Sequence, residues 1–274
     1  MGIFDRIFGR TKTSAPPTVP PPPSHRADPT EAKFKITRLA SDGRRGVAGE
    51  YYHRKDIAAF VGRRRLASAG DWDAGLRTPA YLLREPKNRY DHNAVQVMLP
   101  HAGATVLAGY LSADEAPRWQ PLLQRLESAG RIAECSAAIY RNNRSDGYDV
   151  VLRLSDPEDA EFANAEPDDV TFLSADRQCA VTGEKDHQDV LLPYLHRLGH
   201  VWATLHPATV SRGKYSGSST IEVRIDDKPV GSLTATQGER YAEVLGYGEV
   251  VASEARVYEG ANYLEVQLML PKVD

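Results

Sequence analysis

An internal repeat is the feature that most constrains the fold of this 274-residue chain. Val47-Ala48-Gly49-Glu50 recurs 134 residues later as Val181-Thr182-Gly183-Glu184, and an apolar stretch with helical spacing follows each copy. The offset falls to about 116 at the end of the repeat, so the second copy has shorter loops. Four further pairs of segments match in the same order: 94–97 with 220–223, 109–112 with 231–234, 119–123 with 241–245, and 139–154 with 257–270. A repeat of this length predicts two copies of one arrangement of strands and helices.

The pattern within each copy indicates a mainly β structure with some helix. Residues 94–97 and 220–223 alternate apolar and polar side chains, which is typical of half-buried strands. Ser112 and Thr234 are each followed three residues later by Glu115 or Gln237, a capping box that predicts the start of a helix. Each copy therefore reads as strand, helix, two or three strands, helix and two strands. We expect tandem small, partly open β-barrels of about 100 residues, each with about two helices.

Two segments of unusual composition divide the chain. Residues 11–30 contain seven prolines and predict an extended linker. Residues 156–176 contain eight acidic side chains and no lysine or arginine, which predicts an exposed interdomain linker. The predicted organisation is a short amphipathic segment with a proline-rich linker at 1–30, a first barrel at 31–155, the acidic linker at 156–176, and a second barrel at 177–274.

The N-terminal ten residues are too few to form a stable helix alone. Ile3, Phe4, Ile7 and Phe8 fall on one helical face, so contact with a partner or a membrane surface would order the segment, and the alternative is a disordered tail. No run of eighteen apolar residues predicts a membrane span, and no signal peptide is evident. We expect a cytoplasmic protein.

Few residues point to catalysis, to a metal site or to another cofactor. We therefore expect a non-enzymatic protein that binds neither a metal nor another cofactor. Cys135 and Cys179 predict neither a disulfide framework nor a zinc site, and Cys135 falls in an apolar strand. His196 and His200 have the spacing of two ligands on one helix face, but no HExxH pattern accompanies them. The sequence around Gly213 lacks Walker spacing, and no nucleophile elbow or nuclease motif stands out.

Basic side chains are concentrated early in the first copy. Residues 44–65 hold seven lysines and arginines, including Arg44, Arg45 and Arg54, against two acidic residues. A basic face of this kind attracts a phosphate backbone, because docked cations release condensed counterions. The alternative is a solvated helix end, since Arg63 to Arg65 follow an apolar helical pattern and cations favour a helix C-terminus.

The stretch from Leu83 to Val97 carries the most specific combination of side chains. Tyr90 offers a stacking platform for a nucleic-acid base. Asp91 repels phosphate but accepts a hydrogen bond from a hydroxyl, so it can select a free 3'-OH. Asn88 can donate to a phosphate oxygen, and the basic residues at 44, 45 and 54 would follow the backbone. The alternative is a polar turn in which the aspartate bonds its own backbone.

These motifs together resemble the HIRAN domain, a family found in DNA-remodelling helicases and in small bacterial proteins. The resemblance rests on Val47 to Tyr52, on Leu83 to Val97 and on Gly109-Tyr110-Leu111, and it covers about residues 34–154. It implies an OB-like barrel that captures single-stranded DNA by its 3' end. It further implies that Asn88, Tyr90 and Asp91 lie on the loop that holds the terminal nucleotide, with Tyr51 and Tyr52 on a flanking strand.

Two departures from the family pattern concern the aromatic residues. Glu50 stands before the paired tyrosines where some members have an arginine, so Arg54 is the candidate basic partner. Tyr110 stands where a relative has a histidine. The second copy has no NxYD string between Thr204 and Thr220, so we interpret it as a degenerate HIRAN-like repeat that pairs with the first barrel or recruits a partner.

The resulting hypothesis is a protein that captures single-stranded DNA 3' ends during DNA repair or replication-fork processing. One alternative is a protein-interaction adaptor, and another is an accessory subunit of a separate helicase or nuclease. Salt dependence separates the first two, because binding to DNA weakens steeply with ionic strength whereas apolar docking does not.

Overall fold

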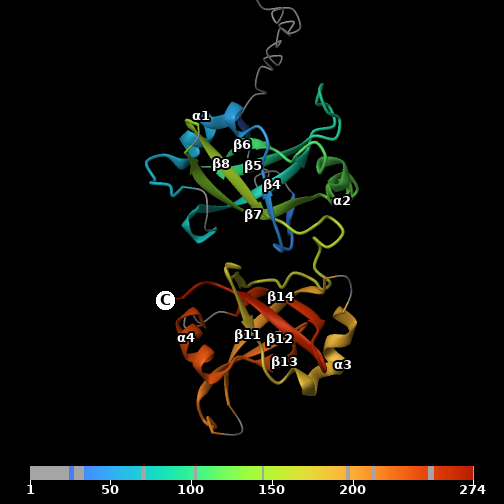
Figure 1. The fold of residues 1–274 in the computed structure, drawn as a ribbon. Helices are drawn as coiled ribbons and strands as arrows, with labels where there is room; N and C mark the ends of the chain where they lie inside the picture. Colours follow the sequence, from blue (N-terminus) through green and yellow to red (C-terminus); the bar gives the residue numbers. More distant parts are fainter. Residues whose placement is uncertain are drawn as a thin grey trace, which may run out of the picture.

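The computed structural model describes residues 25–27, 34–68, 72–101, 104–143, 145–195, 198–210, 214–245 and 250–273. It contains two curled β-sheets, shown in Figure 1 in the blue-to-green and yellow-to-red parts of the chain. Segment 1–10 and the predicted linker up to residue 24 lie outside the described residues. The predicted mainly β fold with helices is confirmed.

The first sheet consists of eight strands, with a helix before β4 and another after β6. Its strands are β1 (His25–Ala27), β2 (Lys35–Arg38), β3 (Arg44–Gly46), β4 (Leu76–Arg84), β5 (Val95–His101), β6 (Ala104–Tyr110), β7 (Arg131–Asn142) and β8 (Gly147–Arg153). Its helices are α1 (Glu50–Val61), the short 3-10 helix η1 (Trp72–Ala74) and α2 (Ala116–Ser128).

The second sheet has seven strands: β9 (Thr171–Phe172), β10 (Arg177–Ala180), β11 (His200–Thr209), β12 (Ser219–Ile225), β13 (Lys228–Ser232), β14 (Val251–Glu259) and β15 (Leu264–Leu270). Its helices are η2 (Glu184–His187), α3 (Gln188–Leu191), η3 (Leu192–Tyr194) and α4 (Ala235–Leu245). None of the described helices has the length and apolar character needed to cross a bilayer.

The two sheets share one strand order. The first runs β6-β5-β4-β7-β8-β3 and the second runs β13-β12-β11-β14-β15-β10. A short parallel strand is added at the corresponding place, β2 on β7 and β9 on β14. The repeated sequence segments therefore occupy equivalent positions in two equivalent topologies.

Each sheet closes through one residue that follows the last strand of the shared order, β3 in the first sheet and β10 in the second. Ala48 exchanges two backbone hydrogen bonds with Tyr110 at 2.7 and 2.9 Å, and Thr182 exchanges two with Ser232, both at 2.8 Å. The close approach requires glycine, because a Cβ at Gly109 would lie 2.4 Å from the Ala48 carbonyl oxygen. In each barrel a single bridging residue thus joins the two ends of the sheet, so the barrel is only partly closed.

Helix α1 forms as the apolar spacing predicts. Gly49 takes a left-handed conformation and turns the chain into the helix, which buries Ile57, Phe60 and Val61. Arg64 donates to the carbonyls of Phe60 and Val61, so it caps the C-terminal end of the helix. The predicted helix-closing role for this part of the basic stretch is therefore found.

Two capping boxes were predicted, and they differ in the structure. Thr234 and Gln237 bond each other's backbone N–H groups at 3.0 and 3.3 Å, which is the reciprocal arrangement. Ser112 instead donates to the side chain of Glu115 at 3.0 Å, and α2 begins without a side-chain cap. Each barrel has its own apolar core, with the fully buried Trp119 in the first. Cys135 and Cys179 are both buried free thiols.

The prediction that residues 156–176 form an exposed linker is wrong. Ala160 is fully buried in the core of the first barrel, and Phe162 stacks on Trp202 of the second with ring centroids 3.9 Å apart. Residues 171–172 form β9 on the second sheet. Apolar side chains within the acidic segment anchor it, and its carboxylates pair with arginines of the first barrel.

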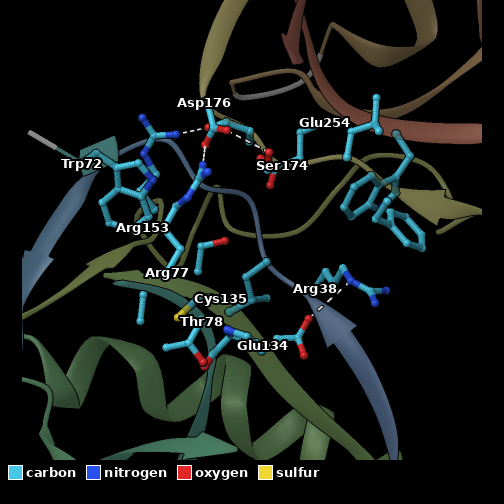
Figure 2. Close-up of a pocket in the computed structure, with 18 residues that line it drawn as sticks. Arg38, Trp72, Arg77, Thr78, Glu134, Cys135, Arg153, Ser174, Asp176 and Glu254 are labelled. Atoms are coloured by element: carbon cyan, nitrogen blue, oxygen red, sulfur yellow. Dashed lines mark hydrogen bonds and ion pairs between the residues drawn. The ribbon is translucent and has the colours of Figure 1, made fainter. Parts of the chain in front are cut away.

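A cavity of about 390 Å³ lies at the junction of the two barrels (Figure 2). Its charged side chains pair with one another: Arg77 with Asp176, and Arg38 with Glu134. Arg153 donates to the backbone carbonyl of Ala175. The junction therefore combines internally paired charges with the aromatic contacts of Trp202.

Glu254 projects from β14 to the first barrel at this junction. Its carboxylate accepts hydrogen bonds from Ser41, at 3.2 Å from the backbone N–H and at 2.7 Å from the hydroxyl. Burial raises the pKa of Glu254 to about 7, and the two bonds from Ser41 oppose that rise. Contact between the barrels thus buries Glu254 at the junction and raises its pKa toward neutral pH.

Candidate nucleic-acid interface

A groove of about 700 Å³ brings the three sequence motifs of the first barrel together. Its walls are the start of α1, the loop between β4 and β5, and the chain at the end of β6. The side chains that carry polar or aromatic groups into it are Tyr52, His53, Glu85, Lys87, Asn88, Arg89, Tyr90, Asp91 and Tyr110.

Asn88 determines the shape of the loop between β4 and β5. Its Oδ1 accepts the backbone N–H groups of Tyr90 at 2.9 Å and Asp91 at 3.2 Å, and its Nδ2 donates to Glu85 at 2.9 Å. The Oδ1 atom is thus committed to the turn, while the Nδ2 amide keeps a second N–H. Asn88 therefore positions the loop, and its predicted contact with a phosphate stays a prediction.

Asp91 adopts the turn that was the alternative interpretation, with one oxygen left over. Its Oδ1 accepts the backbone N–H of Asn93 at 2.8 Å. Among the described residues, no partner is found for its Oδ2. The Asx turn and a ligand-binding role are therefore compatible, since each uses a different oxygen.

Two tyrosines expose their rings at the groove. Tyr90 is 59% exposed and Tyr52 is 58% exposed, although both are large aromatic side chains. The guanidinium of Arg89 lies 4.6 Å from the centroid of the Tyr90 ring. An exposed ring beside a cation is the combination that binds single-stranded nucleic acid by stacking and charge.

The prediction that Tyr51 and Tyr52 lie on a strand is wrong. Both belong to α1, because the left-handed Gly49 starts a helix that the apolar residues further on stabilise. Only Tyr52 lines the groove. Tyr51 turns toward Arg54, which donates to its carbonyl at 2.7 Å and lies 4.2 Å from its ring centroid. Arg54 and Tyr51 therefore form a pair on the helix, outside the groove lining.

The floor of the groove contains Tyr110 and His53. Tyr110 donates to Glu85 at 3.1 Å, so the tyrosine is tied to the same carboxylate as Asn88. His53 is almost fully buried, and its Nδ1 has no hydrogen-bond partner within the described ranges. Burial lowers the pKa of His53, with Asp56 acting in the opposite direction, which favours the neutral ring near pH 7.

Arg44 and Arg45 do not join the groove as predicted. Arg45 is paired with Glu115 and with Asp156, the latter at 2.7 Å. Arg44 lies on the other side of its strand, 5.9 Å from the ring centroid of Trp72. Neighbouring residues of a strand point to opposite faces, so the basic stretch cannot form one continuous face.

Lys87 and Arg89 are the cations that line the groove, and the sequence analysis missed them. Both are exposed and alternate along the loop with Asn88 and Tyr90. That alternation is visible in the sequence. The signal is weak beside the basic stretch at 44–65, because it consists of two cations where that stretch has seven.

Only one member of the candidate metal pair, His200, lies among the described residues, and it stands on a strand rather than on a helix. His200 begins β11 and is buried, and His196 lies outside the described residues. Within the described ranges, no group of three or more potential ligands is positioned to hold a metal ion.

Comparison with protein families matches residues 58–155 to the model of the HIRAN domain. The first barrel is a HIRAN domain. The match runs from within α1 to the end of β8 and includes the whole β4–β5 loop, and it starts later than the predicted boundary near residue 34. HIRAN domains bind DNA, so the match assigns nucleic-acid binding to this part of the chain. Searches of curated proteins and of solved structures gave no match.

Proposed function

We propose that the groove of the HIRAN domain captures the 3' end of single-stranded DNA. The observation that supports this most strongly is the joint presence of two exposed tyrosines, two cations and one uncommitted carboxylate oxygen in a single groove. Each group suits a different part of a terminal nucleotide. The HIRAN match covers the loop that supplies four of the five groups.

The aromatic groups bind bases without reading their sequence. Tyr52 and Tyr90 come from different elements, the first from α1 and the second from the loop between β4 and β5. Stacking on one ring contributes about 1–3 kcal/mol per base, and every base has a face to offer. Lys87 and Arg89 attract the phosphates on either side of a stacked base.

The carboxylate accounts for a preference for the end of the strand. Asp91 Oδ2 can accept a hydrogen bond from a 3'-hydroxyl, whereas a 3'-phosphate or a continuing strand brings negative charge against it. Asn88 and the bond to Asn93 hold the carboxylate in place. A fixed acceptor of this kind discriminates better than a mobile one, because less conformational freedom is lost on binding.

We also propose that the chain acts without catalysis of its own, in DNA repair or in the processing of replication forks. A protein that holds a 3' end supplies the substrate position, and a separate helicase or nuclease supplies the chemistry. The support for this partner class is the absence of motor, nuclease and hydrolase motifs from the sequence. Co-purification with such an enzyme is the expected observation.

The test compares strands that end in a 3'-hydroxyl and a 3'-phosphate by fluorescence anisotropy. We expect the wild type to bind the hydroxyl end about tenfold more tightly, since a hydrogen bond to a charged group contributes about 1.5–3 kcal/mol. Asp91→Asn should abolish the preference while keeping an oxygen for the turn. Asp114→Asn, an exposed neutral replacement beside the groove, should preserve it.

Equal binding of both strands by the wild type would sink the end-capture proposal. Binding that is weak and insensitive to salt would favour the adaptor function instead, because phosphate contacts make affinity fall with ionic strength.

A further inference from the structure

The acidic segment covers a row of arginines on the first barrel. Asp156 pairs with Arg45 at 2.7 Å and with Arg118 at 3.4 Å. Glu158 pairs with the same Arg118 at 2.9 Å. Three residues further on, both carboxylate oxygens of Glu161 accept hydrogen bonds from Arg125, at 2.5 and 3.1 Å. Each of the three arginines thus has an acidic partner from residues 156–161.

The row of arginines begins at the edge of the groove. Leu111 and Ala113 line the groove, and Glu115, which pairs with Arg45, is two residues beyond. Arg118 and Arg125 follow on α2, seven residues apart and hence on one face of the helix, about 10 Å from each other along its axis. Figure 1 shows the yellow-green chain that leaves β8 passing near α2. The row therefore leads from the groove along α2.

The ion pairs of Arg118 and Arg125 are of the kind that another anion can replace. The side chains of Arg118, Glu158 and Arg125 are 48%, 59% and 61% exposed. Exposed ion pairs contribute little net stability and are screened by salt. A guanidinium binds a phosphate in the same bidentate geometry that it uses for a carboxylate, donating two parallel hydrogen bonds.

We propose that Arg45, Arg118 and Arg125 form a track for the phosphates of the strand that enters the groove, and that residues 156–161 occupy this track until a long enough strand displaces them. The proposal rests on the proposed function of the groove. It assigns the acidic segment a role in selection. A polyanion that lacks a 3' end for the groove has to displace the attached acidic segment by charge alone, so it binds weakly. A strand whose 3' end is already bound in the groove displaces the segment more easily, because its phosphates are held beside the track.

The test uses two double variants with the same change in charge in the same segment. Glu158→Gln with Glu161→Gln removes carboxylates that pair with the track. Asp168→Asn with Asp169→Asn removes two exposed carboxylates that have no ion pair among the described residues. Anisotropy is measured with 3'-hydroxyl strands of about four and about 20 nucleotides, the first long enough for the groove only.

We expect the Glu158/Glu161 variant to bind the long strand about three- to tenfold more tightly than wild type and to bind the short strand unchanged. Its plot of log affinity against log salt should be steeper by about 1, because about 0.7 counterions are released for each phosphate contacted on a single strand. Adding Arg118→Gln and Arg125→Gln should cancel the gain. Thermal unfolding of each variant shows whether the fold is retained.

Two results would overturn the track. One is an equal gain in the Asp168/Asp169 variant, which would indicate a general effect of charge. The other is an equal gain on the short strand, which would place the effect in the groove. If the wild type shows no preference for a 3'-hydroxyl, the groove proposal is contradicted. The comparison of long and short strands tests the track separately.

Discussion

Tyr90→Ala should weaken binding of single-stranded DNA by about fivefold to about 150-fold, because one stacked base contributes about 1–3 kcal/mol. Tyr90 is exposed on a loop, so its truncation should leave the unfolding temperature near that of the wild type. Tyr90→Phe keeps the ring and should bind nearly as the wild type does. Fluorescence anisotropy at a fixed salt concentration measures all three proteins.

Tyr215→Ala is the matched control for this prediction. Tyr215 is 56% exposed, lies 5.5 Å from the ammonium of Lys214, and occupies the loop between β11 and β12, which corresponds to the loop that carries Tyr90. Its loop lacks the Asn88 and Asp91 turn. A similar loss of affinity in both variants would show that the groove of the first barrel has no special part in binding.

Glu254→Gln should stabilise the protein above neutral pH by about 3 kcal/mol, the equivalent of a pKa raised from 4.5 to about 7 at 1.36 kcal/mol per unit. The folded state holds the proton of Glu254 more tightly than the unfolded state does. Stability that depends on this proton is therefore present below the unfolded pKa of 4.5 and is lost as pH rises to about 7. A glutamine is neutral throughout and can still accept from Ser41.

The difference between wild type and variant is measured by chemical denaturation from about pH 4 to about pH 8. It should be small at the acid end and should reach its full size above pH 7. Glu239→Gln, an exposed replacement on α4 of the same barrel, should show no such trend. A constant difference at every pH would mean that the pKa of Glu254 is the same in the folded and unfolded states, which contradicts the effect of burial.

The periodicity of the sequence predicted most of the fold because it reports local structure and burial. Alternation at 94–97 and 220–223 marked β5 and β12, and helical spacing marked α1 and α2. The expectation that 94–97 is half-buried is wrong, because Gln96 is buried as fully as its apolar neighbours on β5. The order of the repeated segments then implied two equivalent topologies. The closure at Ala48 and Thr182 could not be predicted, because it depends on contacts between residues fifty or more positions apart.

The acidic segment shows why composition alone misleads. Eight carboxylates and two prolines predicted an exposed linker, but isolated apolar residues within it, Ala160, Phe162 and Phe172, find partners on the two barrels. Where those partners lie is set by tertiary structure. The same holds for Arg45, whose availability to a ligand depends on a carboxylate 111 positions away.

At the site, residue types were easier to predict than directions. Tyr52, Tyr90, Asp91 and Tyr110, which the sequence marked as candidate DNA-binding residues, all line one groove. It did not separate Tyr51 from Tyr52, because that distinction follows from the helical start at Gly49. It also overlooked His53, whose burial and missing partner appear only when the groove is assembled.

The most direct measurement of the central claim is photocrosslinking that locates the end of the strand. A single strand of about eight nucleotides carries 5-iodo-2'-deoxyuridine at its 3' terminus or, in a second strand, at its 5' terminus, and mass spectrometry identifies the attached residue. We predict that the 3'-terminal probe attaches to Tyr52 or Tyr90 and that the 5'-terminal probe does not. Attachment of both probes to the same residues, or of the 3' probe to Tyr215, would contradict capture of the 3' end in this groove.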